Sequence, residues 1–379
     1  MKKITKACVF FIENLLIKVF SIAKVKKSYI MLDSWNGREF SGDIKVLYDY
    51  LVEHFSHANF ILVTKQSRVV SCKIREVSRK SLKYYYFRAC SYHYITNYYY
   101  VNQLRSVKTR RNTHYILVWH AAGIFKKIGK STADSQGKRA INKAGKNISA
   151  LIVSSKHVKE VYARDLGITK ERVVTTGIFR SDFIVKNKLT KASILEKYGL
   201  EKLGLKTIIL YAPTIRDDKS VDFLPDFKVM KETLGSKYSV VLQLHPMNGR
   251  YQVDEAVNDF VLQIQTATSE ELMICADIMI TDYSSLIFDF AYFQRPMVFY
   301  IPDGENYISS KGFYIDYFEN TPGKKAINSQ ELIESILTTQ KDFKRYQGVR
   351  DVLLEYSQMD GRACERFVEM FFKEQPWLK

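Results

Sequence analysis

Short β-rich runs alternate with segments of helical apolar spacing along most of this chain, and the alternation occurs in two successive blocks. Strand–helix alternation is typical of βαβ units, which build a parallel sheet with helices on both faces. The predicted strands are residues 28–33, 59–64, 115–119, 150–153 and 172–176 in the first block, and 206–212, 239–244, 260–265, 278–281 and 297–300 in the second. The main predicted helices are residues 44–55, 227–234, 269–275 and 286–293.

A polar, lysine-rich stretch over residues 184–205 separates the two blocks and is predicted to be a linker. The chain is therefore predicted to be an α/β protein with two doubly wound, Rossmann-like domains, residues 28–185 and 206–350. Domains of this kind bind ligands at the carboxyl ends of their strands, so we expect the two domains to face a ligand cleft.

The first 27 residues are predicted to form an amphipathic helix with a lysine-rich stripe. Its apolar face comprises Phe11, Ile12, Leu15, Leu16, Val19 and Ile22. The apolar runs are far shorter than the ~20 residues that cross a bilayer. Two interpretations stay open: the helix lies in the interface of an anionic leaflet, or it packs on the core of the first domain. Residues 351–379 are set apart as a C-terminal segment, with one helix predicted over 351–372.

Positive charge is concentrated in the first part of the chain. Residues 1–150 hold 28 basic and 8 acidic side chains, whereas residues 151–379 hold 30 and 32. This asymmetry indicates an anionic partner for the first domain. Basic and aromatic residues are interleaved between Arg68 and Tyr115, so a single-stranded nucleic acid is a rival partner. Because no RNA-binding signature accompanies them and the rival leaves the second block unexplained, no nucleic-acid partner is predicted.

Several familiar cofactor motifs are missing from the sequence. It contains no Gly-x-Gly-x-x-Gly, Walker A, His-Glu-x-x-His or Asp-x-Asp string, so dinucleotide redox, P-loop hydrolysis and metal-dependent transfer have no support. The five cysteines are widely spaced and odd in number, which predicts reduced thiols rather than disulfides or a zinc site. We expect no cofactor and no metal.

Two histidines stand where predicted strands end, one in each block. His120 is followed by small residues that let a substrate approach, and an imidazole there can accept a proton from a hydroxyl at neutral pH. Lys126 and Lys127 follow it and could offset phosphate charge. His245 ends a strand of the second block. A pair of imidazoles across a cleft suits phosphoryl transfer, whereas two unrelated structural histidines are the alternative.

The string Thr-Asp-Tyr-Ser-Ser at residues 281–285 joins a predicted strand to a predicted helix. Ser284 and Ser285 stand where the helix begins, so their hydroxyls, the free backbone N–H groups and the helix dipole predict an anion site without glycines or metal. The alternative is an ordinary serine N-cap that binds nothing. Asp289 lies one turn further on, where a carboxylate could hold a substrate hydroxyl.

Together these strings resemble the CDP-glycerol glycerophosphotransferases of teichoic acid synthesis, bacterial enzymes of the two-domain GT-B type. The similar segments are residues 35–48, 119–129, 177–182, 211–217, 244–246, 281–289, 295–296, 312–314 and 360–363. The family's polymerising members usually carry Gly-Thr-Pro after the motif histidine, whereas this chain has Ala121-Ala122-Gly123, closer to the short priming members. Phe179 and Gln243 also depart from the family's usual residues, and the acceptor stays open.

The resemblance implies a role for each matching residue. His120 is similar to the family's catalytic histidine, the base on the acceptor hydroxyl, and His245 to its second essential histidine, near the pyrophosphate. The positions similar to those that contact CDP-glycerol are Arg180, Pro213, Thr214, Ser284, Ser285 and Asp289.

The reaction that the resemblance implies moves glycerol phosphate from CDP-glycerol to a hydroxyl and releases CMP. The implied acceptor is a polyprenyl-diphosphate-linked saccharide or a growing anionic polymer of the teichoic acid or capsule type. The protein is therefore expected to be peripheral, at the cytoplasmic face of the bacterial membrane. CDP-ribitol or a nucleotide sugar as the donor is the alternative, with the same fold.

Overall fold

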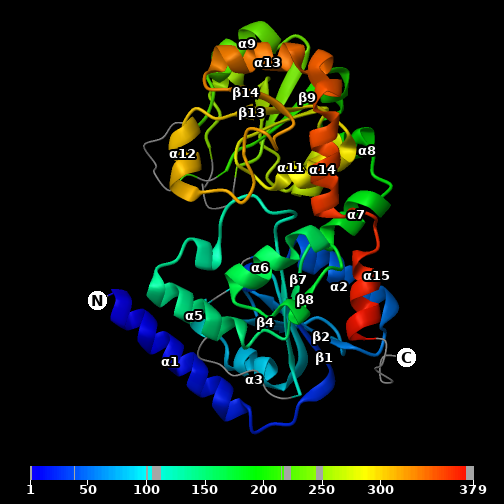
Figure 1. The fold of residues 1–379 in the computed structure, drawn as a ribbon. Helices are drawn as coiled ribbons and strands as arrows, with labels where there is room; N and C mark the ends of the chain where they lie inside the picture. The colour runs from blue at the N-terminus through cyan, green and yellow to red at the C-terminus, as the bar shows by residue number, and fades with distance from the viewer. Residues whose placement is uncertain are drawn as a thin grey trace. The chain divides into compact units, whose positions relative to one another are not determined.

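The structure, a computed structural model, describes residues 2–37, 39–99, 101–104, 112–214, 216, 223–244 and 251–372. Its contacts separate the chain into two compact units. Unit 1 is Met1–Ala122, Ile128–Val185 and Asp360–Lys379, and unit 2 is Gly123–Lys127 and Lys186–Met359. Each unit is built around its own, mostly parallel sheet with helices packed on it, so the α/β prediction is confirmed (Figure 1).

Unit 1 contains, over the described residues, an eight-stranded sheet in the order β3-β4-β2-β1-β5-β6-β7-β8. Its strands are β1 (Lys26–Asp33), β2 (Asn59–Thr64), β3 (Arg68–Val69), β4 (Ile74–Ser78), β5 (Ser91–Thr96), β6 (His114–Val118), β7 (Ala150–Ile152) and β8 (Val173–Val174). All neighbours pair in parallel except β3 and β4, which form an antiparallel hairpin at one edge. The order runs outward from β1 and β5 in opposite directions, so the topological switch point lies between these two strands.

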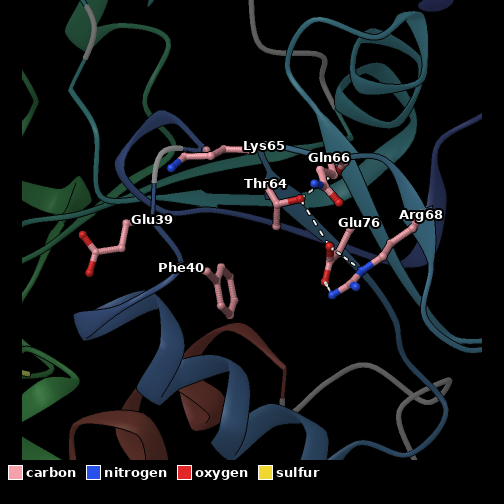
Figure 2. A pocket seen from close by; sticks show the side chains of 8 residues that line it. Glu39, Phe40, Thr64, Lys65, Gln66, Arg68 and Glu76 are labelled. Atoms are coloured by element: carbon pink, nitrogen blue, oxygen red, sulfur yellow. Dashed lines mark hydrogen bonds and ion pairs between the residues drawn. The ribbon is translucent and has the colours of Figure 1, made fainter. Parts of the chain in front are cut away.

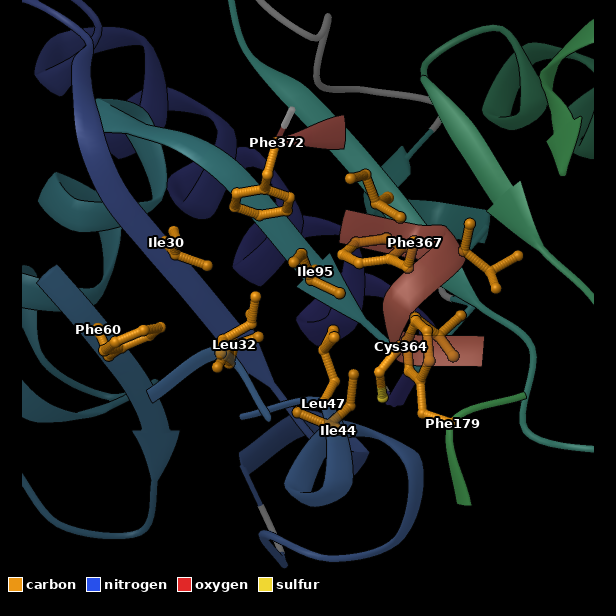
Figure 3. Close-up of a cluster of buried hydrophobic side chains, with 14 of the residues drawn as sticks. Ile30, Leu32, Ile44, Leu47, Phe60, Ile95, Phe179, Cys364, Phe367 and Phe372 are labelled. Carbon is orange, nitrogen blue, oxygen red and sulfur yellow. The ribbon is translucent and has the colours of Figure 1, made fainter. Parts of the chain in front are cut away.

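The helices of unit 1 are α1 (Lys2–Phe20), α2 (Gly42–His54), α3 (Leu82–Cys90), α4 (Val101–Leu104), α5 (Ser135–Gly145), α6 (Lys159–Leu166), α7 (Arg180–Lys186) and α15 (Ala363–Phe371). Figure 3 shows side chains of α2 and α15 packed on the strands, with Phe367 and Phe372 close to Ile95. Asp182 joins α15 to the unit, because its carboxylate accepts hydrogen bonds from the Ala363 and Cys364 N–H groups, both at 2.8 Å.

Helix α1 packs on α3 through the face that the sequence marks as polar. Ile17 is buried, Phe20 contacts the Tyr86 ring at a centroid distance of 6.0 Å, and the Tyr85 hydroxyl lies 3.5 Å from the Glu13 carboxylate. The predicted apolar face points to solvent, with Phe11 70% exposed and Ile22 88% exposed. The helix therefore packs on unit 1, as the second interpretation expects, but through its other face, and its contact with a membrane stays a prediction. Among the described residues, none of the helices combines the length and apolar character that a bilayer span requires.

Unit 2 contains, over the described residues, a six-stranded sheet in the order β11-β10-β9-β12-β13-β14, with every pair parallel. Its strands are β9 (Thr207–Ala212), β10 (Tyr238–Leu242), β11 (Val261–Leu262), β12 (Ile278–Thr281), β13 (Met297–Tyr300) and β14 (Gly323–Ala326). Strands β9, β12 and β13 are buried on both faces and therefore appear in the sequence as continuous apolar runs. The switch point of this sheet lies between β9 and β12.

The helices of unit 2 are α8 (Lys191–Lys197), α9 (Phe227–Leu234), α10 (Ser269–Cys275), α11 (Leu286–Phe290), α12 (Gly304–Lys311), α13 (Ser329–Asp342) and α14 (Gln347–Ser357). Their starts follow ordinary capping chemistry. Thr268 and Glu271 form a capping box at α10, and Asn328 accepts the Glu331 N–H at the start of α13.

The boundary between the two units falls within the predicted linker, after Val185, and the linker is structured, with α8 and a 3₁₀ helix, η5 (Glu201–Leu205). Two expectations about the elements are wrong. The single helix predicted over 351–372 is two helices, α14 and α15, because Gln358 and Gly361 take left-handed backbone angles with φ of 49° and 75°. The helix predicted over 286–293 is α11 followed by a 3₁₀ turn, η8 (Ala291–Phe293).

Candidate active site

In unit 1, His120 lies two residues after the end of β6, on the carboxyl edge of the sheet. Its ring contacts two indoles. The ring centroid of Trp119 is 4.7 Å from that of His120, and the centroid of Trp35 is 5.2 Å away. Two aromatic neighbours restrict the orientation of the imidazole, which is what a general base requires.

Trp35 reaches His120 from the loop that follows β1, and its backbone is strained. Its φ is 46°, in the left-handed region that bulky residues seldom adopt. The Trp35 N–H donates to the Asn97 side-chain oxygen at 2.8 Å, and Asn97 is buried one residue after β5. The switch point between β1 and β5 is thus bridged by a hydrogen bond that holds the indole in place. Strain maintained in this way is typical of functional sites.

Arg180 fixes the backbone of the same histidine. One guanidinium nitrogen donates to the His120 carbonyl oxygen at 2.7 Å and to the Asp43 carboxylate at 3.0 Å. Asp43 is buried and also accepts the Arg180 backbone N–H at 2.9 Å. A buried, doubly bonded ion pair of this kind makes Arg180 a residue that positions His120 in this structure, and its contact with the donor stays a prediction.

In unit 2, the strand ends at the switch point are joined by Asp282. Ala212 of β9 is in register with Thr281 of β12, so the residues that follow them leave the sheet together. The Thr214 N–H donates to both Asp282 carboxylate oxygens, at 2.9 and 3.0 Å. Pro213, next to Thr214 in the chain, is buried. The structure therefore brings Pro213 and Thr214, which the family resemblance implied, to the start of the Tyr283-Ser284-Ser285 loop.

Arg216 completes this framework. Its guanidinium donates to Asp282 at 2.7 Å and to both oxygens of Asp303, at 2.6 and 3.0 Å. Burial by itself lowers the Arg216 pKa, but Asp282 and Asp303 outweigh burial and raise that pKa above its usual value. The guanidinium also lies over the Tyr283 and Tyr307 rings, which stack on each other at 4.0 Å. One arginine thus ties three segments of the unit 2 site edge together.

Ser284 and Ser285 lie beside this framework, and their hydroxyls contribute little to the hydrogen bonding of the helix start. The Ser284 hydroxyl accepts the Leu286 N–H at 3.3 Å, and Ser285 occupies the N-cap position without a side-chain cap bond. The Thr214 hydroxyl oxygen is buried and has no hydrogen-bond partner among the described residues. Helix α11 has five residues, so its dipole is small and the hydroxyl and amide groups must supply most of any anion binding. Asp289, on the same helix, is fully buried.

The segment that follows His120 is part of unit 2. Gly123 has a φ of 63°, and a Cβ there would lie 2.4 Å from the Phe288 ring of α11, so only glycine fits. The Lys127 N–H donates to the Gly312 carbonyl at 3.0 Å, and the Lys126 ammonium lies 3.3 Å from the Tyr307 hydroxyl. Both lysines therefore belong to the same unit as Thr214 and Ser284.

The structure groups the predicted site residues by unit. His120 and Arg180 are together in unit 1, and Lys126, Lys127, Pro213, Thr214, Ser284, Ser285 and Asp289 are in unit 2. His245 lies outside the described residues, so its role stays a prediction.

Sequence reasoning did not single out Trp35, Asp43, Arg216 or Asp303. Arg216 was inside a quoted motif, but its partners are 66 and 87 residues away, so spacing gave no signal. The positive φ of Trp35 is likewise invisible in the sequence. Over the described residues, no group of three or more His, Cys, Asp or Glu side chains is arranged to hold a metal ion, and metal independence stays a prediction.

Comparisons with known proteins agree on one group. The family model described as CDP-Glycerol:Poly(glycerophosphate) glycerophosphotransferase matches residues 15–373. The chain is 30% identical over 369 residues to a teichoic acid poly(ribitol-phosphate) polymerase of Bacillus spizizenii, covering 93% of this chain and 57% of that protein. It is 27% identical over 390 residues to a teichoic acid poly(glycerol phosphate) polymerase of the same organism, covering 94% of this chain and 95% of that protein.

Among solved structures, the chain is similar to the wall teichoic acid polymerase TagF, in a structure of a variant soaked with CDPG. The TM-score is 0.81 at 23% sequence identity, over 97% of this chain and 95% of the solved chain. This likeness supports the fold. The chain spans little more than half the length of the ribitol-phosphate polymerase and nearly all of the glycerol-phosphate polymerase that it matches.

Proposed function

Because the chain belongs to the CDP-glycerol:poly(glycerophosphate) glycerophosphotransferase family of teichoic acid enzymes, we propose that it transfers glycerol phosphate from CDP-glycerol to an acceptor hydroxyl. CMP is the second product. The observation that carries the proposal is the unit 2 switch point, where Thr214, Ser284 and Ser285 gather around the Asp282–Arg216 framework. We propose that CDP-glycerol binds there and that the fold is of the GT-B type.

The chemical step in this proposal is an in-line displacement at phosphorus. His120 takes the proton of the acceptor hydroxyl, and the oxygen attacks the β-phosphorus of CDP-glycerol. A new P–O bond forms as the bond to the bridging oxygen breaks, and CMP leaves with that oxygen. Only Ala121 and Ala122 separate His120 from Gly123, whose backbone packs against Phe288 in unit 2, and this short tether supports the assignment.

Charge on the pyrophosphate is balanced by the protein in this proposal. The hydroxyls of Ser284, Ser285 and Thr214 donate hydrogen bonds to the pyrophosphate oxygens. Lys126 and Lys127 supply positive charge from the segment after His120. His245 is the further candidate near the leaving group, and Asp289 the candidate for a glycerol hydroxyl. Preorganised donors of this kind are usually the largest single contribution to catalysis, and the proposed step uses these donors without a metal.

The proposed acceptor is a polyprenyl-diphosphate-linked saccharide or a teichoic-acid-type polymer at the cytoplasmic face of the membrane. The support is α1, whose outward face carries the exposed Phe11 and Leu15, with the exposed Ile22 just beyond its end. Lys24, Lys26 and Lys27 follow the helix. An apolar face next to lysines suits the interface of an anionic leaflet.

Liposome sedimentation tests this membrane placement. We expect the wild type to sediment with vesicles that contain anionic lipid, and Phe11→Glu with Leu15→Glu to abolish sedimentation. The matched control is Leu337→Glu with Met370→Glu, which places the same charges on exposed apolar positions elsewhere. Equal sedimentation of the two double variants would contradict the role of α1.

CDP-ribitol is the second candidate donor, because one of the matched relatives is a ribitol-phosphate polymerase. Both donors share the cytidine diphosphate, so the unit 2 framework suits either. Product analysis separates them. The protein is incubated with a lipid-linked disaccharide analogue and either donor, and the products are weighed by mass spectrometry. We expect addition of glycerol phosphate and release of CMP. Addition of ribitol phosphate in its place would reassign the donor, and no addition from either would remove the proposal.

A further inference from the structure

A hollow lies on the carboxyl edge of the unit 1 sheet, beyond the strand that precedes His120. It has a volume of about 270 Å³ and is lined by Glu39 and Phe40 on one side and by Thr64, Lys65, Arg68 and Glu76 on the other. The first two follow β1, and the others belong to the ends of β2 and the β3–β4 hairpin. Figure 2 shows Phe40 between the Lys65–Glu39 end and the Arg68–Glu76 end of this pocket.

The chemistry of this pocket differs from that of an anion site. Two cations and two carboxylates line it, so its formal charge is balanced, although unit 1 as a whole is strongly basic. Arg68 donates to both oxygens of Glu76, at 2.9 Å each, which neutralises the Arg68 charge within the wall. A phosphate would meet carboxylates here, whereas a neutral polyhydroxylated ligand finds both donors and acceptors.

The aromatic side of the pocket, formed by Phe40, favours the same kind of ligand. Phe40 is half-buried, held edge-to-face against Tyr48 at 5.4 Å, and borders the pocket. A fixed aromatic face next to carboxylates, an amide and a lysine is the combination that binds the apolar face and hydroxyl rim of a sugar ring. The pocket volume of about 270 Å³ lies just below the usual range for ligand sites, roughly 300–1,000 Å³, and suits one ring rather than a long chain.

The floor of the pocket is rigid. A Cβ added at Gly37 would lie 3.0 Å from the Val63 side chain and 3.7 Å from Arg79, and Gly37 has a φ of 71°. Arg79 in turn donates to the buried Asp33 at 3.0 Å, and the Tyr94 hydroxyl donates to the same carboxylate at 2.6 Å. This buried network joins the ends of β1, β4 and β5, so the loop that carries Glu39 and Phe40 has a fixed base.

The pocket and His120 lie on the same carboxyl edge of the unit 1 sheet. The number of strands between them sets the distance from one to the other. β2 and β6 are three positions apart in the strand order. With neighbouring strands about 4.8 Å apart, the end of β2 is roughly 14 Å from the end of β6. Trp35 stands between them on the loop that also carries Phe40. A saccharide whose terminal hydroxyl reaches His120 can therefore place a preceding ring in the pocket.

We infer that this pocket binds a neutral sugar ring of the acceptor saccharide, one ring or more behind the hydroxyl that reacts. The inference rests on the proposed function for its biological meaning, because it gives a lipid-linked saccharide its binding subsite in unit 1. It assigns the acceptor's sugar, rather than its phosphate, to the β1–α2 loop and the β3–β4 hairpin.

The test compares two double variants of the full chain, each of which removes one acid and one base. Glu39→Ala with Lys65→Ala alters the pocket, and Glu53→Ala with Lys83→Ala alters exposed positions outside it. Binding of N,N′-diacetylchitobiose and of glycerol 3-phosphate is measured by ligand-observed NMR. We expect the disaccharide to bind the wild type and the control equally, and the pocket variant about 10-fold more weakly, as for the loss of two hydrogen bonds. Phe40→Leu should weaken the disaccharide similarly.

Kinetics with a lipid-linked disaccharide analogue supplies the second readout. We expect the pocket variant to raise the acceptor KM about 10-fold, with the donor KM and kcat unchanged. Disaccharide binding that is absent, or equal in the two double variants, overturns the inference, as does glycerol 3-phosphate binding that depends on the pocket. If the wild type shows no transfer but binds the disaccharide through the pocket, the proposed function fails and the inference stands.

Discussion

The site edges of the two units are built in different ways. In unit 2, the switch point is held by charge: Arg216 joins Asp282 and Asp303, and Asp282 also binds the Thr214 N–H. In unit 1, the groups beside the His120 ring are aromatic and neutral: Trp35 contacts that ring and donates a hydrogen bond to Asn97, while the Arg79–Asp33 and Arg180–Asp43 ion pairs lie behind them. Beside it lies an open, charge-balanced pocket.

This difference matches the ligands that we propose for each side. A buried network of charged groups is rigid and suits a small anionic donor that always has the same shape. An aromatic edge with an adjacent pocket tolerates variation in the rest of the ligand while it fixes the reacting group. The comparison therefore predicts that changes in unit 1 alter turnover or acceptor binding, and that changes in unit 2 alter stability or donor binding.

The largest effect is expected at His120. His120→Ala removes the proposed base, so kcat should fall by about 10²- to 10⁴-fold while the dissociation constant of CDP-glycerol is unchanged. Single-turnover kinetics and calorimetric titration of the donor measure the two quantities. His57→Ala, at an exposed position, is the control. Full activity of His120→Ala would contradict the assignment of His120 as the base. Loss of donor binding in this variant would contradict the assignment of donor binding to unit 2 alone.

Removal of Arg216 should act mainly on stability. Arg216→Met leaves Asp282 and Asp303 without their cation in a buried site, which costs about 3–5 kcal/mol of unfolding free energy for a buried pair that loses one partner. Chemical denaturation compares this variant with Arg345→Met, an exposed arginine. A loss of less than about 1 kcal/mol would show that the charge network of unit 2 is not what holds its site edge.

Acid sensitivity should originate in unit 1, at His93. This side chain is fully buried, and neither ring nitrogen has a hydrogen-bond partner among the described residues. Burial, with a smaller effect from His114, lowers the pKa of His93 to about 3. The unfolded chain takes up the proton near its ordinary pKa of about 6.5, so stability is full above that pH and falls as the pH drops towards 3.

Between pH 7 and pH 5, this one group should reduce the free energy of unfolding by about 2 kcal/mol. His93→Phe should remove most of that loss, because the ring already stacks on Phe372 at a centroid distance of 4.6 Å. Denaturation at the two pH values measures it, with the exposed His54→Phe as the control. An unchanged pH dependence in His93→Phe would assign the acid sensitivity to other groups.

The smallest effect is expected at the Thr214 hydroxyl. Thr214→Val keeps the side-chain shape and removes one proposed donor to the pyrophosphate, so the donor KM should rise about 10-fold with kcat nearly unchanged. Thr266→Val, at an exposed position, is the control. A lower kcat with an unchanged donor KM would move Thr214 from ground-state binding to the transition state.

The sequence alone was sufficient to predict the buried parallel strands. Strands such as β1, β2, β9 and β12 are covered on both faces, so their residues form apolar runs that stand out in any reading. Strands with mixed composition were missed. β5 carries a buried histidine, and the edge strand β14 contains Lys324 and Lys325, so neither resembles a buried apolar run.

For the site, the sequence located residues but not their partners. Ser284 was predicted from its place between a strand and a helix, and Thr214 was implied by the family resemblance; the parallel register of β9 and β12 brings their loops together. The ion pairs of Arg216 and the role of Arg180 behind His120 depend on contacts between distant segments, which no local pattern encodes. The outward apolar face of α1 is a similar case, because the sequence shows that a helix is amphipathic but not which face its neighbour covers.

The return of the chain to unit 1 at α15 has a consequence for biosynthesis. Phe367 and Phe372 fill the same core as Ile30, yet more than 330 residues separate them. The entropy of closing so long a loop grows only slowly with length, so the penalty at equilibrium is modest. The order in which the two units can complete their folding is affected more. During translation the core of unit 1 is completed only after α15 has left the ribosome, and the segment that forms the second sheet has by then emerged in full.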